Sequence, residues 1–201
     1  MKIHTLPLGD YQTNTYIVEN EGRCAIIDPG YAPETILSFL EKHSLAVDAI
    51  LLTHGHFDHV GAVERLVEKT GCRLWMRQAD WSQKLSPLTA YFYPIANCDF
   101  TDVQFCEEGE VISAAGLSFS VLETPGHTHG SVCYLCDDAL FSGDTLFAGS
   151  CGRTDLPGGD WNTILESLKR LSELPGEYTV YPGHGNSTTL SQEKLYNPYM
   201  R

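Results

Sequence analysis

Residues 48–59 read DAILLTHGHFDH, an apolar run followed directly by a polar cluster. Its first part is a continuous apolar run, which is typical of a strand buried on both faces of a sheet. The second part, THGHFDH, crowds three histidines and an aspartate into seven residues. Protein cores rarely tolerate several ionisable groups together, because each one loses its hydration on burial. The stretch therefore predicts a buried strand that ends at a polar site.

The flanking residues predict further elements. Residues 14–20 and 23–28 are expected to form two strands joined by a Glu-Gly turn. Residues 33–43 should form a helix, since a proline suits its first turn and apolar residues share one face. A second helix is expected over residues 58–71, where apolar side chains recur at spacings of three and four before Gly71.

The second half of the chain mixes the same two patterns. One more strand is expected in the first half, at residues 73–76. Strands are expected in the second half at residues 117–124, 131–136, 139–143 and 178–183, and Asp160 should cap a helix over residues 160–176. Strands paired through hairpins are thus mixed with strand–helix units in both halves, which favours an α/β fold with two facing sheets and helices outside. No linker or low-complexity segment divides the sequence, so one domain over residues 1–201 is expected.

Composition narrows the possible partners. The formal net charge is −13, from 13 Lys and Arg against 26 Asp and Glu, which argues against binding to nucleic acid or to an anionic membrane. The N-terminal residues do not resemble a signal peptide, and the seven cysteines are expected to be free thiols in a reducing cytoplasm. A small molecule is the expected partner, and the oligomeric state stays open.

The residues of the polar cluster are spaced as ligands of a metal site would be. His54 and His56 lie two apart in an extended segment, so both side chains can reach one ion, and Asp58 and His59 follow at the start of the next helix. Three more segments place a polar residue after a strand and a glycine, at His127, Asp144 and His184. Imidazole and carboxylate suit zinc, iron and manganese. Seven such residues suffice for two neighbouring sites, and Asp144 could be shared.

Two simpler interpretations compete with a catalytic metal site. A single histidine at a strand end is usually an ordinary surface or core residue, but a His-x-His-x-Asp-His cluster is costly to bury without a counter-charge. A structural zinc site is the other alternative. Such sites favour four closed ligands with several cysteines, and the cluster contains no cysteine. The sequence therefore favours a catalytic site.

Taken together, His54-x-His56-x-Asp58-His59, Gly126-His127, Gly143-Asp144 and Gly183-His184 resemble the motifs of the metallo-β-lactamase superfamily. The resemblance implies a four-layered αββα sandwich with the metals at one edge between the sheets. It implies one site from His54, His56 and His127, a second from Asp58, His59 and His184, and Asp144 as the bridge. Asp28 in IIDPG matches a frequent motif beside the site, where it would orient a ligand; a plain turn at Asp-Pro-Gly is the alternative.

Within the superfamily, the chain is most similar to the glyoxalase II-like group, the hydroxyacylglutathione hydrolases. Residues 143–160 (GDTLFAGSCGRTDLPGGD) and 182–199 (PGHGNSTTLSQEKLYNPY) resemble its short members. The main β-lactamases place a cysteine where this chain has Asp144, which argues against β-lactamase activity. Larger glyoxalase II enzymes add a C-terminal helical domain that helps bind glutathione. Only 16 residues follow Gly185 here (201 minus 185), so the natural thiol stays open.

The resemblance implies a metal-dependent hydrolase that cleaves small acyl-thiol substrates through a hydroxide bridging two divalent metal ions. Zinc is the expected metal, and iron or manganese would also suit the ligands. Asp58 is the expected catalytic residue, because it would ligate and also orient the attacking hydroxide. Arg153 is expected either to pair with a substrate carboxylate or to form a structural salt bridge.

Two other functions stay open. Persulfide dioxygenases also resemble this chain and hold a single iron through the positions of His54, His127 and Asp144. A non-enzymatic metal-binding module is the second alternative. The aromatic segment at residues 88–100 could form a wall of a substrate pocket, and the roles of His129 and Cys151 are undecided.

Overall fold

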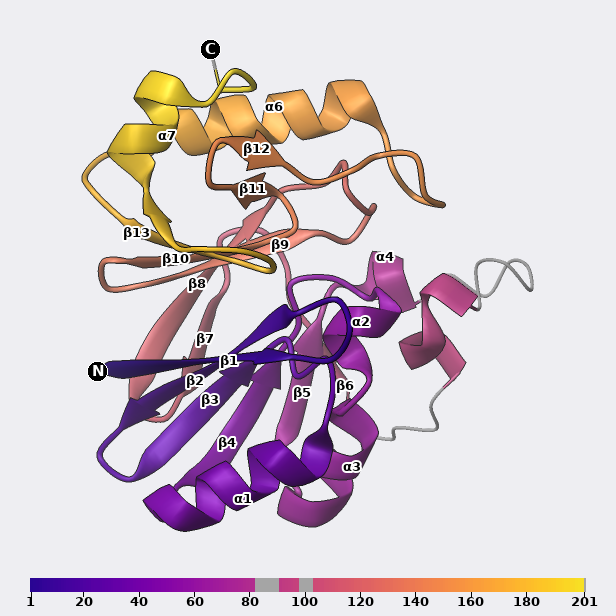
Figure 1. Cartoon of the computed structure of the whole chain (residues 1–201), viewed down its shortest axis with the longest axis vertical. Coiled ribbons are helices and arrows are strands. Elements are labelled where there is room, and N and C mark those ends of the chain that lie inside the picture. Colours follow the sequence, from indigo (N-terminus) through magenta and orange to yellow (C-terminus); the bar gives the residue numbers. More distant parts are fainter. Residues whose placement is uncertain (82–90, 98–102, 201) are drawn as a thin grey trace.

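The computed structural model describes residues 1–81, 91–97 and 103–200. Two six-stranded sheets face each other, in the orders β1-β2-β3-β4-β5-β6 and β14-β13-β10-β9-β8-β7. Helices α1 and α3 cover the outer face of the first sheet, and α6 with α7 covers the outer face of the second (Figure 1). The expected four-layered αββα sandwich is therefore confirmed.

The first sheet is antiparallel at one edge and parallel elsewhere. Its strands are β1 Lys2–Leu8, β2 Thr13–Asn20, β3 Arg23–Ile27, β4 Ala46–Leu51, β5 Arg73–Met76 and β6 Val103–Phe105. Strands β3 to β6 run parallel, and α1 (Pro33–His43) crosses from β3 to β4. Residues Ala49, Ile50 and Leu51 have no exposed surface, because helices and the second sheet cover both faces of β4.

The second sheet is antiparallel except for one pair. Its strands are β7 Val111–Ala114, β8 Leu117–Glu123, β9 Val132–Cys136, β10 Ala139–Gly143, β13 Thr179–Pro182 and β14 Thr188–Thr189. Strands β10 and β13 are parallel and are joined across α6 (Trp161–Ser172). Asp160 caps α6 as expected, since its side chain accepts a hydrogen bond from the amide of Thr163. A small hairpin, β11 Leu146–Phe147 and β12 Ser150–Cys151, and helix α7 Leu190–Tyr196 complete this half.

Three apolar layers hold the sandwich together. The central layer lies between the sheets and includes Phe119, Tyr134 and Phe141. Cys133 and Cys136 belong to different layers, as two residues three apart in a strand should. Every cysteine in the described part of the chain is a free thiol. Among the described residues, no helix is both long and apolar enough to pass through a bilayer.

The helix expected over residues 58–71 is wrong as a single element. The structure has two short helices, α2 Phe57–Val60 and α3 Val63–Thr70. The break has a tertiary cause: the amide of Ala62 donates a 3.0 Å hydrogen bond to the carbonyl of Pro29. The backbone also approaches closely there, because a Cβ at Gly61 would lie 2.4 Å from the carbonyl oxygen of Gly30. The helical pattern is therefore interrupted at residues 61 and 62, where the backbone packs against the loop after β3.

The outer layer under α6 can be tested by removing one side chain. Leu168 is fully buried against the second sheet. Leu168→Ala should lower the free energy of unfolding by about 2–5 kcal/mol, because it removes apolar contacts and leaves a cavity. Urea unfolding followed by circular dichroism measures this loss. The neighbouring Lys169 is exposed, so Lys169→Ala should change the stability by less than about 0.5 kcal/mol. Equal losses in the two variants would contradict the assignment of this layer.

Candidate metal centre

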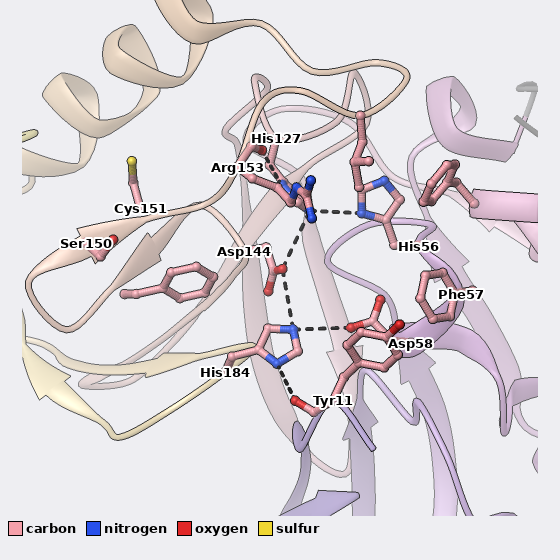
Figure 2. Close-up of a pocket in the computed structure, with 13 residues that line it drawn as sticks. Tyr11, His56, Phe57, Asp58, His127, Asp144, Ser150, Cys151, Arg153 and His184 are labelled. Carbon is pink, nitrogen blue, oxygen red and sulfur yellow. Dashed lines mark hydrogen bonds and ion pairs between the residues drawn. The ribbon is translucent and has the colours of Figure 1, made fainter. Parts of the chain in front are cut away.

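The histidines and aspartates expected from the sequence gather at one edge of the sandwich. They follow the carboxyl ends of β4, β8, β10 and β13. Parallel strands end at the same edge of a sheet, so the pairing of β10 with β13 brings Asp144 and His184 together. Figure 2 shows this edge, where residues from both sheets point toward a common space.

The first cluster is formed by His54, His56 and His127. Each offers a ring nitrogen, and these three nitrogens lie within 4.8 Å of one another. Nδ1 of His56 is 2.9 Å from Nε2 of His127. All three side chains are buried. Nε2 of His54 is buried and makes no hydrogen bond.

The second cluster is formed by Asp58, His59 and His184. Nε2 of His184 lies 3.2 Å from Oδ2 of Asp58, and Nε2 of His59 lies 3.4 Å from Nε2 of His184. Two of these residues sit in the one-turn helix α2, whose start directly after His56 aims them at the neighbouring position. A carboxylate with two imidazoles is a second donor set of the same kind as the first.

Asp144 lies between the two clusters. Its Oδ2 is 3.6 Å from Nε2 of His127 in the first cluster and 3.5 Å from Nε2 of His184 in the second. Its Oδ1 lies 3.4 Å from Nε2 of His59 and makes no hydrogen bond although it is buried. The structure thus brings all seven sequence-predicted residues together, with Asp144 in the middle.

The ionisation of these groups favours a cation. Burial lowers the pKa of His54 far below its usual value and that of His56 to about 3, so both imidazoles are neutral, the form that binds metals. Burial acts to raise the pKa of Asp58, but His184 and His59 outweigh it and hold the pKa at about 2. Burial likewise opposes ionisation of Asp144, and His59 overrides it to lower the pKa. Both carboxylates are therefore charged.

The pKa of His59 shows that the surrounding carboxylates favour a positive charge at this edge. Burial acts to lower this pKa, but Asp144 and Asp28 outweigh burial and raise the pKa well above the usual value. A proton on this ring therefore helps to neutralise the carboxylates. A divalent cation among the same groups would take the place of that proton and would also satisfy the unpaired atoms of His54 and Asp144. The donor set fits zinc, iron or manganese, because it consists of imidazole and carboxylate.

Asp28 orients His59 through the ring nitrogen that faces away from the second cluster. Its Oδ2 lies 3.0 Å from Nδ1 of His59, so Nε2 of that ring faces the second cluster. Asp28 is fixed in turn by Thr53, whose amide and hydroxyl donate hydrogen bonds of 2.8 and 2.6 Å to the carboxylate. Asp28 also has a φ of 48°, in the left-handed region that residues other than glycine rarely adopt. The structure therefore gives Asp28 the contact with a ligand-bearing histidine.

Backbone carbonyls orient two more rings. Nδ1 of His127 lies 2.7 Å from the carbonyl oxygen of Arg153, and Nδ1 of His184 lies 3.1 Å from that of Tyr11 (Figure 2). A carbonyl accepts only from N–H, so each contact places the proton on Nδ1 and leaves Nε2 free to bind a metal.

Sequence reasoning missed Asp80, in the one-turn helix α4 (Gln78–Trp81). This carboxylate is fully buried and ties two ligand-bearing loops together. Its Oδ2 accepts hydrogen bonds from the amide of Gly55 and the hydroxyl of Thr128, and Oδ1 accepts from the amide of Gly130. Gly55 lies between His54 and His56, while Thr128 follows His127. No motif marks Asp80, since its partners are distant in sequence.

A cavity of about 440 Å³ opens beside the clusters. One wall is aromatic and comes from the first half of the chain; the other wall includes the β11–β12 hairpin. The lining residues outside the clusters are Tyr11, Phe57, Phe92, Phe147, Ser150, Cys151, Arg153 and Leu156. The pocket wall predicted at residues 88–100 is represented by Phe92, while residues 88–90 and 98–100 of that segment lie outside the described residues.

Three residues with undecided roles differ in position. Arg153 lines the cavity but forms a two-point ion pair with Asp155, with both N–O distances at 2.7 Å. The Cys151 thiol points away from Asp144 in Figure 2, and burial raises its pKa, which disfavours a nucleophilic thiolate. His129 is exposed and is not among the residues that line this cavity.

Comparison with known proteins identifies the class. The family model described as the metallo-beta-lactamase superfamily matches residues 8–184. The chain therefore belongs to the metallo-β-lactamase superfamily, whose fold binds divalent metals and whose members are mostly metal-dependent hydrolases.

Particular relatives share nearly the whole chain. "Hydroxyacylglutathione hydrolase GloC" of Haemophilus influenzae is 35% identical, and the match covers 100% of this chain and 98% of that protein. The crystal structure of "BLEG-1 B3 metallo-beta-lactamase" is 34% identical, with a TM-score of 0.86 and 99% of both chains covered. The structure of "TTHA1623 in a di-iron-bound form" is 39% identical, with a TM-score of 0.82 over 98% of this chain and 99% of the other.

The buried Asp80 carboxylate makes a testable contribution to the centre. Asp80→Ala would leave the amides of Gly55 and Gly130 without acceptors and loosen both loops. We expect metal affinity to fall by about 10- to 100-fold, as for other groups that hold metal ligands in place. Competition with a chromogenic chelator measures the affinity. Asp138 is exposed and remote from the site, so Asp138→Ala should bind metal normally. An unchanged affinity in folded Asp80→Ala would show that the loops hold their shape without Asp80.

Proposed function

We propose that this protein is a thioester hydrolase that acts on small acyl-thiol substrates and uses two divalent metal ions. The observation that carries the proposal is Asp144, an ionised carboxylate that is 11% exposed, lies within 3.6 Å of both donor clusters and lines an open cavity. Similarity to a hydroxyacylglutathione hydrolase over the full chain supports the choice of a thioester.

The proposed ligands follow the two clusters. His54, His56 and His127 would hold the first metal, Asp58, His59 and His184 the second, and Asp144 would contact both. Metals bound there would lower the pKa of a coordinated water and polarise the substrate carbonyl. Zinc is the expected metal, while the di-iron relative supports testing iron, and manganese also suits the ligands.

Asp58 is the proposed catalytic residue. It lines the cavity, and its low pKa of about 2 keeps it ionised across the physiological range. Its Oδ2 accepts a 3.1 Å hydrogen bond from the hydroxyl of Thr13, which fixes the carboxylate plane. A fixed, charged carboxylate can accept a hydrogen bond from the attacking water and so orient it toward the carbonyl carbon.

Two further residues have proposed supporting roles. Arg153 would contact a carboxylate of the substrate at the cavity mouth, where it would share its guanidinium between that group and Asp155. Asp28 would keep Nε2 of His59 directed at the second metal through its contact with Nδ1.

The metal content of the purified protein tests the ligand assignment. The wild type should bind two transition metals per chain, and His54→Ala and His184→Ala should each retain about one, since each removes a ligand of a different cluster. Elemental analysis gives the stoichiometry. His43 is exposed on α1, so His43→Ala should still bind two. One metal in the wild type that persists in His184→Ala would contradict the two-site arrangement.

The reaction is tested by thiol release from S-D-lactoylglutathione with zinc, manganese or iron supplied. We expect hydrolysis of this thioester. Asp58→Asn should lower kcat by about 100-fold, because the residue keeps its size and loses its charge.

Two parallel assays address other chemistry. The likeness to BLEG-1, described as a B3 metallo-beta-lactamase, makes β-lactam hydrolysis a second candidate, although Asp144 argues against it. Hydrolysis of a chromogenic cephalosporin tests this candidate. Oxygen uptake from glutathione persulfide with ferrous iron tests the dioxygenase alternative. Activity in either assay without thioester cleavage would overturn the proposed function.

A further inference from the structure

The β11–β12 hairpin lines the cavity, but few contacts within the hairpin stabilise it. Its two strands share only two residue pairs, Leu146 with Cys151 and Phe147 with Ser150. A ladder this short is not stable by itself in water. The hairpin nevertheless stands close to the metal centre, because the ring of Phe147 lies 6.2 Å from that of His184. Its position therefore depends on contacts from outside.

Helix α7 supplies those contacts through Asn197, which is fully buried at its C-terminal end. The side-chain nitrogen of Asn197 donates to the carbonyl of Ser150 at 2.9 Å and to Oε2 of Glu193 at 2.8 Å. The carbonyl of Phe147 lies 3.4 Å from the same nitrogen. Asn197 thus holds the backbone of both hairpin strands at the residues that line the cavity.

Glu193 completes the arrangement one helical turn earlier. It is 4% exposed, and its Oε2 accepts a 2.8 Å hydrogen bond from the amide of Gly149 at the hairpin tip. Its Oε1 accepts a 2.7 Å hydrogen bond from the hydroxyl of Thr188, which orients the carboxylate. Glu193 and Asn197 therefore grip the hairpin at its tip and along both strands.

The residues that follow β12 are fixed by their contacts with the metal-centre residues. A Cβ at Gly152 would lie 1.8 Å from the carbonyl oxygen of Asp144, so the chain passes there at contact distance. The next carbonyl, that of Arg153, accepts from His127. With one end fixed at the centre and the other gripped by α7, the hairpin has a defined distance from the metal clusters.

We propose that Glu193 and Asn197 are positioning residues for substrate binding, because they set where the β11–β12 hairpin stands as a wall of the cavity. The inference rests on the proposed function only in taking this cavity as the substrate site. The two residues act through the hairpin and do not touch the reacting atoms. Loss of the grip should weaken substrate binding more than it slows the chemical step, since no group that reacts is removed.

Variants of Glu193 and Asn197 can distinguish the effect of the hydrogen bonds from the effect of the carboxylate charge. In Glu193→Gln, the amide oxygen can still accept from Gly149 and Asn197, while the amide nitrogen can donate to the hydroxyl of Thr188. Glu193→Ala removes every one of these contacts. Asn197→Asp removes the donors and places a second carboxylate beside Glu193. Tyr196 is 70% exposed on the same helix and is a matched control.

Steady-state kinetics on the metal-loaded enzyme provides the first test. We expect KM for the thioester to rise about tenfold in Glu193→Ala and Asn197→Asp, with kcat within about threefold of the wild type. Glu193→Gln and Tyr196→Ala should keep KM within about twofold. A folded Glu193→Ala enzyme with two metals and an unchanged KM would reduce the pair to a purely structural role and overturn the proposal.

Hydrogen exchange gives a readout that does not need turnover. Peptides covering residues 146–151 should exchange at least about tenfold faster in Glu193→Ala, whereas peptides from β9 should be unchanged. Unchanged exchange in the hairpin would overturn the proposal. If the wild type cleaves no thioester, the proposed function is wrong. Hydrogen exchange in the hairpin still tests whether Glu193 and Asn197 hold the hairpin in place. Where a variant does not fold, Thr188→Val removes only the contact that orients Glu193, and its hairpin should still exchange faster; no increase there would also overturn the proposal.

Discussion

The structure depends on the need to balance buried charge at one edge of the sandwich. Two ionised carboxylates, Asp58 and Asp144, share this edge with neutral imidazoles that have unpaired nitrogens. Such a group is stable only beside a cation, because buried charges and unpaired polar atoms are costly in a medium of low polarity. The two sheets, the loops at their strand ends and the outer polar contacts all serve to hold these side chains at fixed distances.

The surrounding contacts explain how such a site keeps its shape. Asp28 fixes His59 from one side, and Asp80 joins the loops of His56 and His127 from the other. Backbone carbonyls hold the rings of His127 and His184, so these two imidazoles do not depend on other side chains for their orientation. The cavity wall is stabilised in a similar way, because helix α7 makes hydrogen bonds to a hairpin that is too short to be stable by itself. The side chains that make these contacts, those of Asp28, Asp80, Glu193 and Asn197, are all buried.

Much of this arrangement could be predicted from local patterns. The apolar run before His54 and the spacing in residues 33–43 predicted a buried strand and a helix that the structure contains. The helix over residues 58–71 was wrong in its middle, because a carbonyl from the distant loop after β3 interrupts it. Asp80 and the β11–β12 hairpin were missed for a related reason. Their roles depend on partners far along the chain, and neither shows the periodicity of a helix or strand in its own segment.

The ligands of the centre come from both sheets, and this has a consequence for the life of the molecule. His54, His56, Asp58 and His59 follow the first sheet, whereas His127, Asp144 and His184 follow the second. No half of the chain contains a full set for both sites, so the centre forms only when the sheets have docked. Metal bound at this edge would then act as a cross-link between the halves and favour the docked state by mass action. The supply of metal ions would set not only how fast the protein works but also how long it stays folded.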